Sequence, residues 1–279
     1  MTDHNTGGAW ELIVTPWHLD EHLPAFPIPV TATQVIPPPL PEGPVAARMN
    51  RLHQAAADAV AQAARPLVLS GDCPTARAAV AGIQRRHQDL AVVWLDAHGD
   101  FNTPAITASG YLGGMALAML TGRTPGLFDD PLGLRPIPDT SVILADARDL
   151  DPAERDALDT SQVRRVPADP AAITSALGEL GPAPVYLHLD IDVIDGDQIP
   201  GARFPSGLGP SLTRIEECLA AVCATADVVA AYIACAWLPD RVSDPTTRDT
   251  IARFTRALGA DLAWHESAGQ RPAEGGSKS

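Results

Sequence analysis

Five short apolar runs, rich in β-branched residues, constrain the fold of this 279-residue chain more than any other feature. Each run is continuously apolar rather than alternating, which is typical of strands buried on both faces of a parallel sheet. An earlier run, Trp10–Thr15, has the same character and predicts a sixth strand. The five runs are Pro66–Ser70, Ala91–Leu95, Ser141–Ala145, Val185–Leu189 and Val228–Ala236.

Segments with helical signals lie between these runs. Val45–Arg65 carries apolar residues three and four positions apart, and Asp169-Pro170 is typical of an N-cap followed by proline at the first helical position. We expect Thr213 and Glu216 to form a capping box and Asp244-Pro245 to open the last helix. Strands that alternate with helices predict an α/β fold, a three-layer α/β/α domain with a mainly parallel sheet.

The pattern predicts a single domain over residues 1–264, because it shows no internal repeat and no second domain. Pro24–Pro44 and Phe128–Thr140 are rich in proline or glycine, so we expect irregular loops there. His265–Ser279 has the composition of a disordered tail.

Charge and the N-terminus restrict the partners and the compartment. The formal net charge is −14 with no offsetting Lys/Arg cluster, so nucleic acid and anionic membranes are not expected partners. Met1–Gly8 lacks a signal-peptide pattern, and no apolar run approaches the roughly 18–20 residues that cross a bilayer. The four cysteines have no CxxC spacing and suggest free thiols. We therefore expect a soluble, cytoplasmic protein.

Acidic residues follow four of the five strands directly, and a parallel sheet gathers such residues at one edge. In extended chain, residues two apart share a face, so Asp96, His98 and Asp100 should point together, as should Asp190 and Asp192. These ligands would repel strongly without cations between them, and carboxylate with imidazole suits an ion such as Mn²⁺. An isolated acid such as Asp72 is more often a turn former.

Three motifs at these positions resemble the arginase/agmatinase (ureohydrolase) superfamily, within a match from about Pro66 to Pro239. Asp96–Pro104 (DAHGDFNTP) is similar to the family's DAHxDxNTP box, and His188–Asp195 (HLDIDVID) is similar to its second aspartate box. Ser70–Cys73 (SGDC) stands where the family usually has GGDH. The resemblance implies an arginase-like fold and a binuclear manganese site.

By that resemblance, Asp96 and Asp190 would bridge two manganese ions. His98 and Asp192 would complete the shell of one ion. Cys73 and Asp100 would complete that of the other. Asp100, which would also orient the bridging hydroxide, and His98 are the implied catalytic residues. The implied reaction is attack of that hydroxide on a guanidinium-like carbon, which releases urea or an analogue and an amine.

The resemblance also implies substrate contacts. Asn102 and Ser109 match positions that contact the α-carboxylate of an amino-acid substrate, and Asp151 matches the one that reaches its α-amino group. Tyr111 replaces an asparagine of the same carboxylate site. Turn formation and capping are the alternative roles for Ser109 and Asp151. Relatives form trimers or hexamers, and the sequence leaves a homo-oligomer open.

Three departures alter the implied chemistry. Cys73 replaces a histidine ligand, a feature shared with an Nω-hydroxyarginine amidinohydrolase that the chain resembles in this respect. A thiolate suits Mn²⁺ less well than Zn²⁺, so one site should be weak or selective for another ion. Gly113, within Ser109–Met115, stands where the family has a proton-shuttle histidine, and His18 is a candidate replacement donor. Ala236 stands where the family has a glutamate that pairs with the guanidinium.

These observations leave two functions from different classes. The first is a hydrolase that cleaves a C–N bond of a guanidino, hydroxyguanidino or ureido amino-acid derivative, in specialised metabolism. The alternative is an inactive, metal-holding scaffold of the arginase fold, which the departures at Gly113 and Ala236 favour. Retention of the buried metal ligands favours the enzyme, because buried acids without a cation are costly.

Overall fold

The computed structural model describes residues 8–36, 39–128, 132–238, 240–241 and 244–264. Within these residues, eight parallel strands form one sheet, and it contains all six predicted strands. The strands are β1 (Glu11–Thr15), β4 (Ala32–Val35), β5 (Pro66–Ser70), β6 (Ala91–Asp96), β7 (Val142–Asp146), β8 (Arg164–Val166), β9 (Val185–Asp190) and β10 (Val228–Ala234). A separate antiparallel hairpin pairs β2 (Trp17–His18) with β3 (Glu21–His22).

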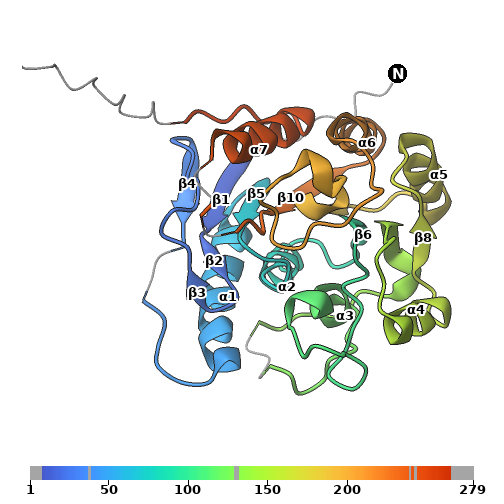
Figure 1. Ribbon diagram of the computed structural model, residues 1–279, viewed down its shortest axis with the longest axis horizontal. Helices are drawn as coiled ribbons and strands as arrows, with labels where there is room; N and C mark the ends of the chain where they lie inside the picture. Colours follow the sequence, from blue (N-terminus) through green and yellow to red (C-terminus); the bar gives the residue numbers. More distant parts are fainter. Residues whose placement is uncertain (1–7, 37–38, 129–131, 239, 242–243, 265–279) are drawn as a thin grey trace, which may run out of the picture.

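Helices cover both faces of the sheet, which confirms the predicted three-layer arrangement (Figure 1). On one face lie α1 (Val45–Gln62), α2 (Ala76–Ile83), α3 (Ala116–Leu120) and α4 (Pro152–Asp159). On the other lie α5 (Pro170–Leu180), α6 (Leu212–Thr225) and α7 (Pro245–Ala257). Each face has its own cluster of buried apolar side chains, so the strands are covered on both sides, as their continuous apolarity predicts.

The strand order places the ends of four strands together. The order across the sheet is β4-β1-β5-β10-β9-β6-β7-β8, so β10, the last strand in the chain, lies between β5 and β9. The four central strands therefore run β5-β10-β9-β6, and the segments that follow them meet at one edge. In open α/β sheets, the ligand crevice lies outside the carboxyl ends of the strands where the order changes.

The capping box predicted for Thr213 and Glu216 does not form. The N-cap of α6 is Ser211, whose hydroxyl accepts a hydrogen bond from the Arg214 amide at 3.2 Å, so Thr213 does not form a capping box. The Glu216 carboxylate instead receives two hydrogen bonds from Arg253 of α7, at 2.7 and 2.6 Å. A long-range ion pair thus replaces the expected local contact.

Pro24–Pro44 is not wholly irregular, because β4 lies within it and pairs with β1 at the sheet edge. The other predictions on helix starts hold: Asp169 accepts hydrogen bonds from the Ala171 and Ala172 amides, and Pro245 begins α7. All four cysteines are free thiols. His265–Ser279, the predicted tail, lies outside the described residues. None of the helices described here has the length and apolarity that a membrane span requires.

Candidate metal centre

A cavity of about 300 Å³ opens at the carboxyl ends of the central strands. Every predicted site residue lines it except Asp96, which contacts the cavity residue His98. The predicted residues on its wall are Cys73, His98, Asp100, Asn102, Ser109, Tyr111, Asp151, Asp190 and Asp192. The structure therefore brings together side chains that lie as much as 119 positions apart in the chain, from Cys73 to Asp192.

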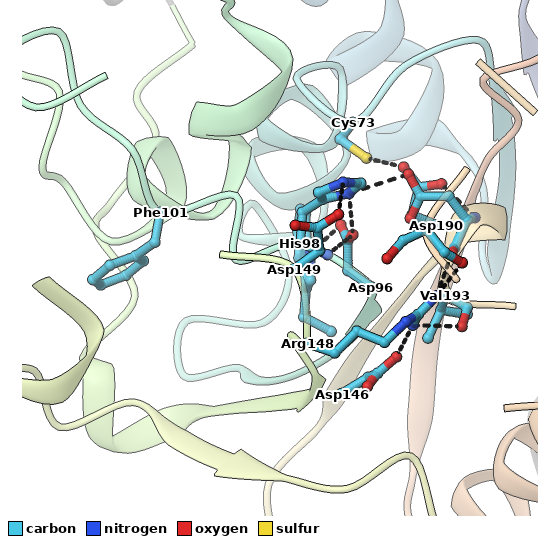
Figure 2. Close-up of polar contacts among 12 residues, drawn as sticks. Cys73, Asp96, His98, Phe101, Asp146, Arg148, Asp149, Asp190 and Val193 are labelled. Atoms are coloured by element: carbon cyan, nitrogen blue, oxygen red, sulfur yellow. Dashed lines mark hydrogen bonds and ion pairs between the residues drawn. The ribbon is translucent and has the colours of Figure 1, made fainter. Parts of the chain in front are cut away.

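One group of candidate ligands surrounds His98 (Figure 2). The His98 Nδ1 atom lies 3.4 Å from Asp96 Oδ1 and 3.3 Å from Asp192 Oδ2. The candidate ligand atoms of these three residues all lie within 4.8 Å of one another. Two carboxylates and one imidazole at this spacing suit a divalent cation.

A second group lies beside the first. The Cys73 thiol donates a hydrogen bond to Asp190 Oδ2 at 2.8 Å (Figure 2). Ligand atoms of Cys73, Asp96 and His188 also lie within 4.8 Å of one another. Asp96 belongs to both groups, the position that a bridging carboxylate would take.

The predicted metal ligands do lie close together, but the chain that carries them is not in the extended conformation expected from the sequence. Strand β6 ends at Asp96, whose Oδ1 accepts a hydrogen bond from the His98 amide at 2.8 Å, and Asp100 has a φ of 50°. Asp192 lies in a 3₁₀ turn, Ile191–Val193, where its amide donates to Asp190 Oδ1 at 3.0 Å. The carboxylates thus cap their own turns and fold the chain back toward the cavity.

Burial and mutual repulsion dominate the electrostatics of the cluster. Burial raises the pKa of the Asp100 and Asp190 carboxyls well above their usual range, and the neighbouring carboxylates raise it further. Burial, with the charge of Asp96, also raises the pKa of Asp192 to about 7. Burial alone would lower the pKa of His98, but its hydrogen bonds to Asp192 and Asp96 raise it to about 12. The cluster therefore requires positive charge, from protons or from cations.

Buried polar atoms without a hydrogen-bond partner indicate whether a metal ion fits the site. Within the part of the chain that the structure describes, Asp100 Oδ2, Asp192 Oδ1 and His188 Nε2 are buried without a hydrogen-bond partner. An unpartnered buried acceptor is costly, and a cation would satisfy all three. Carboxylate, imidazole and thiol are also the side chains that bind first-row divalent metals. The residues therefore fit the binuclear metal site that the sequence implies.

The predicted substrate residues lie on the outer wall of the cavity. Asn102 Nδ2 donates to Asp151 Oδ2 at 3.3 Å, and Asp151 stands at the N-cap of α4 without a side-chain capping bond. The Ser109 hydroxyl accepts from the Tyr111 amide at 3.1 Å. Ser109 thus has the turn role that the sequence left open, and Asp151 is free of a capping role.

Tyr111 occupies the space of a missing side chain. A Cβ atom added to Gly113 would overlap the Tyr111 ring and lie 2.6 Å from its hydroxyl oxygen. That hydroxyl lies 3.0 Å from His18 Nε2, and His18 Nδ1 lies 2.9 Å from the Gly71 carbonyl oxygen. Phe204, which also lines the cavity, has its ring centroid 5.2 Å from that of Tyr111.

Other residues of the site were not singled out in the sequence. Glu154 lines the cavity and accepts a hydrogen bond from the Phe101 amide at 2.8 Å, and Asp149 lies 4.0 Å from His98 Nε2. Both belong to the Arg148–Glu154 segment of the family resemblance. Asp72, by contrast, is interpreted from the sequence as a turn former, and it does accept hydrogen bonds from the Leu19 and Thr75 amides, at 2.6 and 3.0 Å.

Comparisons with known proteins agree with this geometry. The model of the arginase family matches residues 17–259. The Nω-hydroxy-L-arginine amidinohydrolase of Streptomyces lavendulae is 33% identical over 166 residues, which are 58% of this chain and 58% of the relative. An arginase of Staphylococcus aureus (strain COL) is 33% identical over 146 residues, 49% of this chain and 48% of the relative. The alignments thus span about half the length of these curated relatives.

Solved structures show the same fold at lower sequence identity. The arginase of Bacillus cereus superposes with a TM-score of 0.75 at 19% identity, over 94% of this chain and 100% of that one. The arginase of Bacillus caldovelox gives a TM-score of 0.74 at 20% identity, over 94% and 99%. The arginase-like α/β/α fold is therefore established over most of the chain.

Proposed function

The chain belongs to the arginase family, and on that premise we propose that it is a metal-dependent amidinohydrolase of specialised metabolism. Its substrate is a guanidino, hydroxyguanidino or ureido amino-acid derivative, from which it cleaves a C–N bond. The observation that carries the proposal is the pair of overlapping ligand groups that share Asp96 beside the cavity.

Two divalent cations, Mn²⁺ by the family resemblance, would lower the pKa of a water molecule and polarise the guanidino carbon. His98 and Asp192 would hold one of them with Asp96, which joins both groups. Cys73 and Asp100 would hold the other, and Asp190, like Asp96, would contact both. Asp100, one of whose buried oxygens has no hydrogen-bond partner among the described residues, would also orient the attacking water.

Proton transfer is assigned to Tyr111 and His18, because Gly113 has no side chain. Tyr111 lines the cavity, and its hydroxyl is hydrogen-bonded to His18. Burial raises the pKa of Tyr111 above its usual value, so the hydroxyl would act as a relay that passes a proton from the His18 imidazole to the leaving nitrogen. Tyr111→Phe keeps the ring and removes the hydroxyl. We expect it to lower kcat by roughly 10²–10⁴-fold, the usual contribution of a general acid, with metal content unchanged.

The cavity favours a substrate with a weakly basic head group. Ala236 lines it where the family has a glutamate, so a guanidinium would lose its paired anion. Hydroxyguanidino and ureido groups are less basic than guanidine and need that anion less. Asn102, Ser109 and Asp151 remain on the wall to bind the α-carboxylate and α-amino groups.

The test is release of urea or hydroxyurea by Mn²⁺-loaded protein from L-arginine, agmatine and Nω-hydroxy-L-arginine. We expect faster turnover of the hydroxylated substrate. Asp190→Ala should abolish release, whereas Asp58→Ala, which removes an exposed carboxylate paired with Arg85, should not. Metal-loaded protein that is inert on this panel and on L-citrulline would favour the scaffold instead.

A further inference from the structure

His188 is a fully buried histidine directly beneath the candidate metal centre. It lies on β9 two residues before Asp190, and residues two apart on a strand share a face. Its ring stacks on Trp94 of β6, with centroids 3.4 Å apart and planes at 2°, and on Tyr232 of β10, at 4.9 Å and 13°. The ring is thus held in one plane by strands on both sides.

Only one nitrogen of this ring has a hydrogen-bond partner among the described residues. Nδ1 lies 3.5 Å from the Tyr186 hydroxyl, whereas Nε2 is buried with no hydrogen-bond partner among the residues that the structure places. A neutral imidazole that carries its proton on Nδ1 has a lone pair on Nε2. A buried lone pair without a partner is costly unless something else binds it.

The candidate partner is a cation. Ligand atoms of His188, Cys73 and Asp96 lie within 4.8 Å of one another. Cys73 stands where the resemblance places a histidine, so the chain has lost one imidazole ligand there. His188 brings an imidazole to the same place from a neighbouring strand.

We propose that His188 binds the second metal ion together with Cys73 and Asp96, and that it replaces the imidazole lost at position 73. This inference rests on the metal dependence of the proposed function. Trp94 supports the arrangement, because its indole Nε1 donates to Asp96 Oδ2 at 3.1 Å while its ring stacks on His188. Such outer contacts orient metal ligands.

The proposed ligand set makes the two ions unequal. Thiolate and imidazole favour Zn²⁺ or Co²⁺ over Mn²⁺, whereas the His98 group contains only carboxylates and imidazole. We therefore expect the second site to prefer the softer ions. The Tyr186 hydroxyl would accept a hydrogen bond from Nδ1–H, which fixes the ring tautomer and leaves Nε2 to the metal.

The test compares wild type with His188→Phe, which keeps a ring for stacking on Trp94 and Tyr232 but has no ligand atom. Co²⁺ titration of the full chain, followed by calorimetry and the thiolate-to-cobalt absorption band, should give two ions in wild type. In the variant the second ion should bind more weakly, by at least the roughly 10–100-fold that loss of an outer-shell partner causes. His22→Phe, a change on the β2–β3 hairpin, is the control and should leave both affinities unaltered.

A measurement on the wild-type protein tests the proposal even if the His188→Phe variant does not fold. Pulsed EPR of Mn²⁺-loaded wild type, grown with ¹⁵N-histidine, should show nitrogen couplings from two imidazoles. Couplings from one imidazole, or two ions held by His188→Phe with wild-type affinity, would remove His188 from the ligand set and leave the proposed function standing. If wild type binds no divalent ion at all, both proposals fall.

Discussion

Gly113→Ala adds a single methyl group against the Tyr111 ring and so tests how that ring is packed. The added Cβ would overlap the tyrosine ring, so the ring has to move. It is held by the contact between its hydroxyl and His18, at 3.0 Å, and by Phe204, whose ring centroid lies 5.2 Å away. The substitution therefore tests whether this ring fills the space of the family's histidine.

The expected loss in the free energy of unfolding is the sum of the two contacts that the ring gives up, the hydrogen bond to His18 and the aromatic pair with Phe204. A hydrogen bond contributes about 0.5–1.5 kcal/mol, and an aromatic pair contributes a further ~0.5–1.5 kcal/mol. We expect Gly113→Ala to lower the free energy of unfolding by about 1–3 kcal/mol, the usual cost of overpacking. For a domain of this size, each kcal/mol lowers Tm by roughly 2–4 °C.

Gly114→Ala is the matched control, because an added Cβ there meets only Asn102 Nδ2, at 3.9 Å. Both substitutions lower the conformational entropy of the unfolded chain by a similar amount. The difference between their free energies of unfolding therefore measures the clash with Tyr111. In a Tyr111→Ala background, Gly113→Ala should cost nothing further, which gives a coupling energy of about 1–3 kcal/mol. Equal stability of the two glycine variants, measured by urea unfolding, would refute the assigned position of the ring.

Three further predictions concern the metal centre. Asp190→Ala should abolish metal retention, measured by elemental analysis, and leave the circular dichroism spectrum unchanged, because it removes a carboxylate that is costly to bury; unchanged metal content would contradict a bridging role. Cys73→His should strengthen Mn²⁺ binding at the second site, and a titration identical to wild type would place Cys73 outside the ligand shell. Metal-free protein should lose stability as pH rises from about 4 to about 7, because Asp192, with a pKa raised to about 7, keeps a proton in the folded chain that the unfolded chain releases. Saturating Mn²⁺ should remove this trend, and a stability that rises with pH in metal-free protein would contradict it.

The sequence predicts the central sheet well because central strands carry the strongest signal. β5, β6 and β9 are buried throughout, β10 is buried at every residue except Val229, and the apolar runs match the structure to within two residues. β4 and β8 are edge strands with partly exposed side chains, so no apolar run marks them. A strand that is half exposed differs little in composition from a loop.

In the site, too, residue spacing predicts some features, whereas others depend on side-chain packing. Acids at strand ends predict where Asp96 and Asp190 converge, because parallel strands end at one edge. His188 was not singled out, since a histidine inside an apolar strand is usually a satisfied core residue; only its orphaned Nε2 shows otherwise. The filling of the space at Gly113 by Tyr111 depends on side-chain volumes, which linear spacing does not contain.

The altered positions are more informative together than singly. A scaffold that has lost activity is expected to lose side chains independently, yet here the gap at Gly113 is filled by Tyr111, whose hydroxyl meets a second titratable group in His18. The histidine missing at Cys73 is matched by the imidazole of His188, whose Nε2 has no hydrogen-bond partner among the described residues. Buried carboxylates that would be costly without a cation are kept around both changes. Compensated losses around retained charges are typical of a site adapted to another substrate, and they favour the hydrolase over the scaffold.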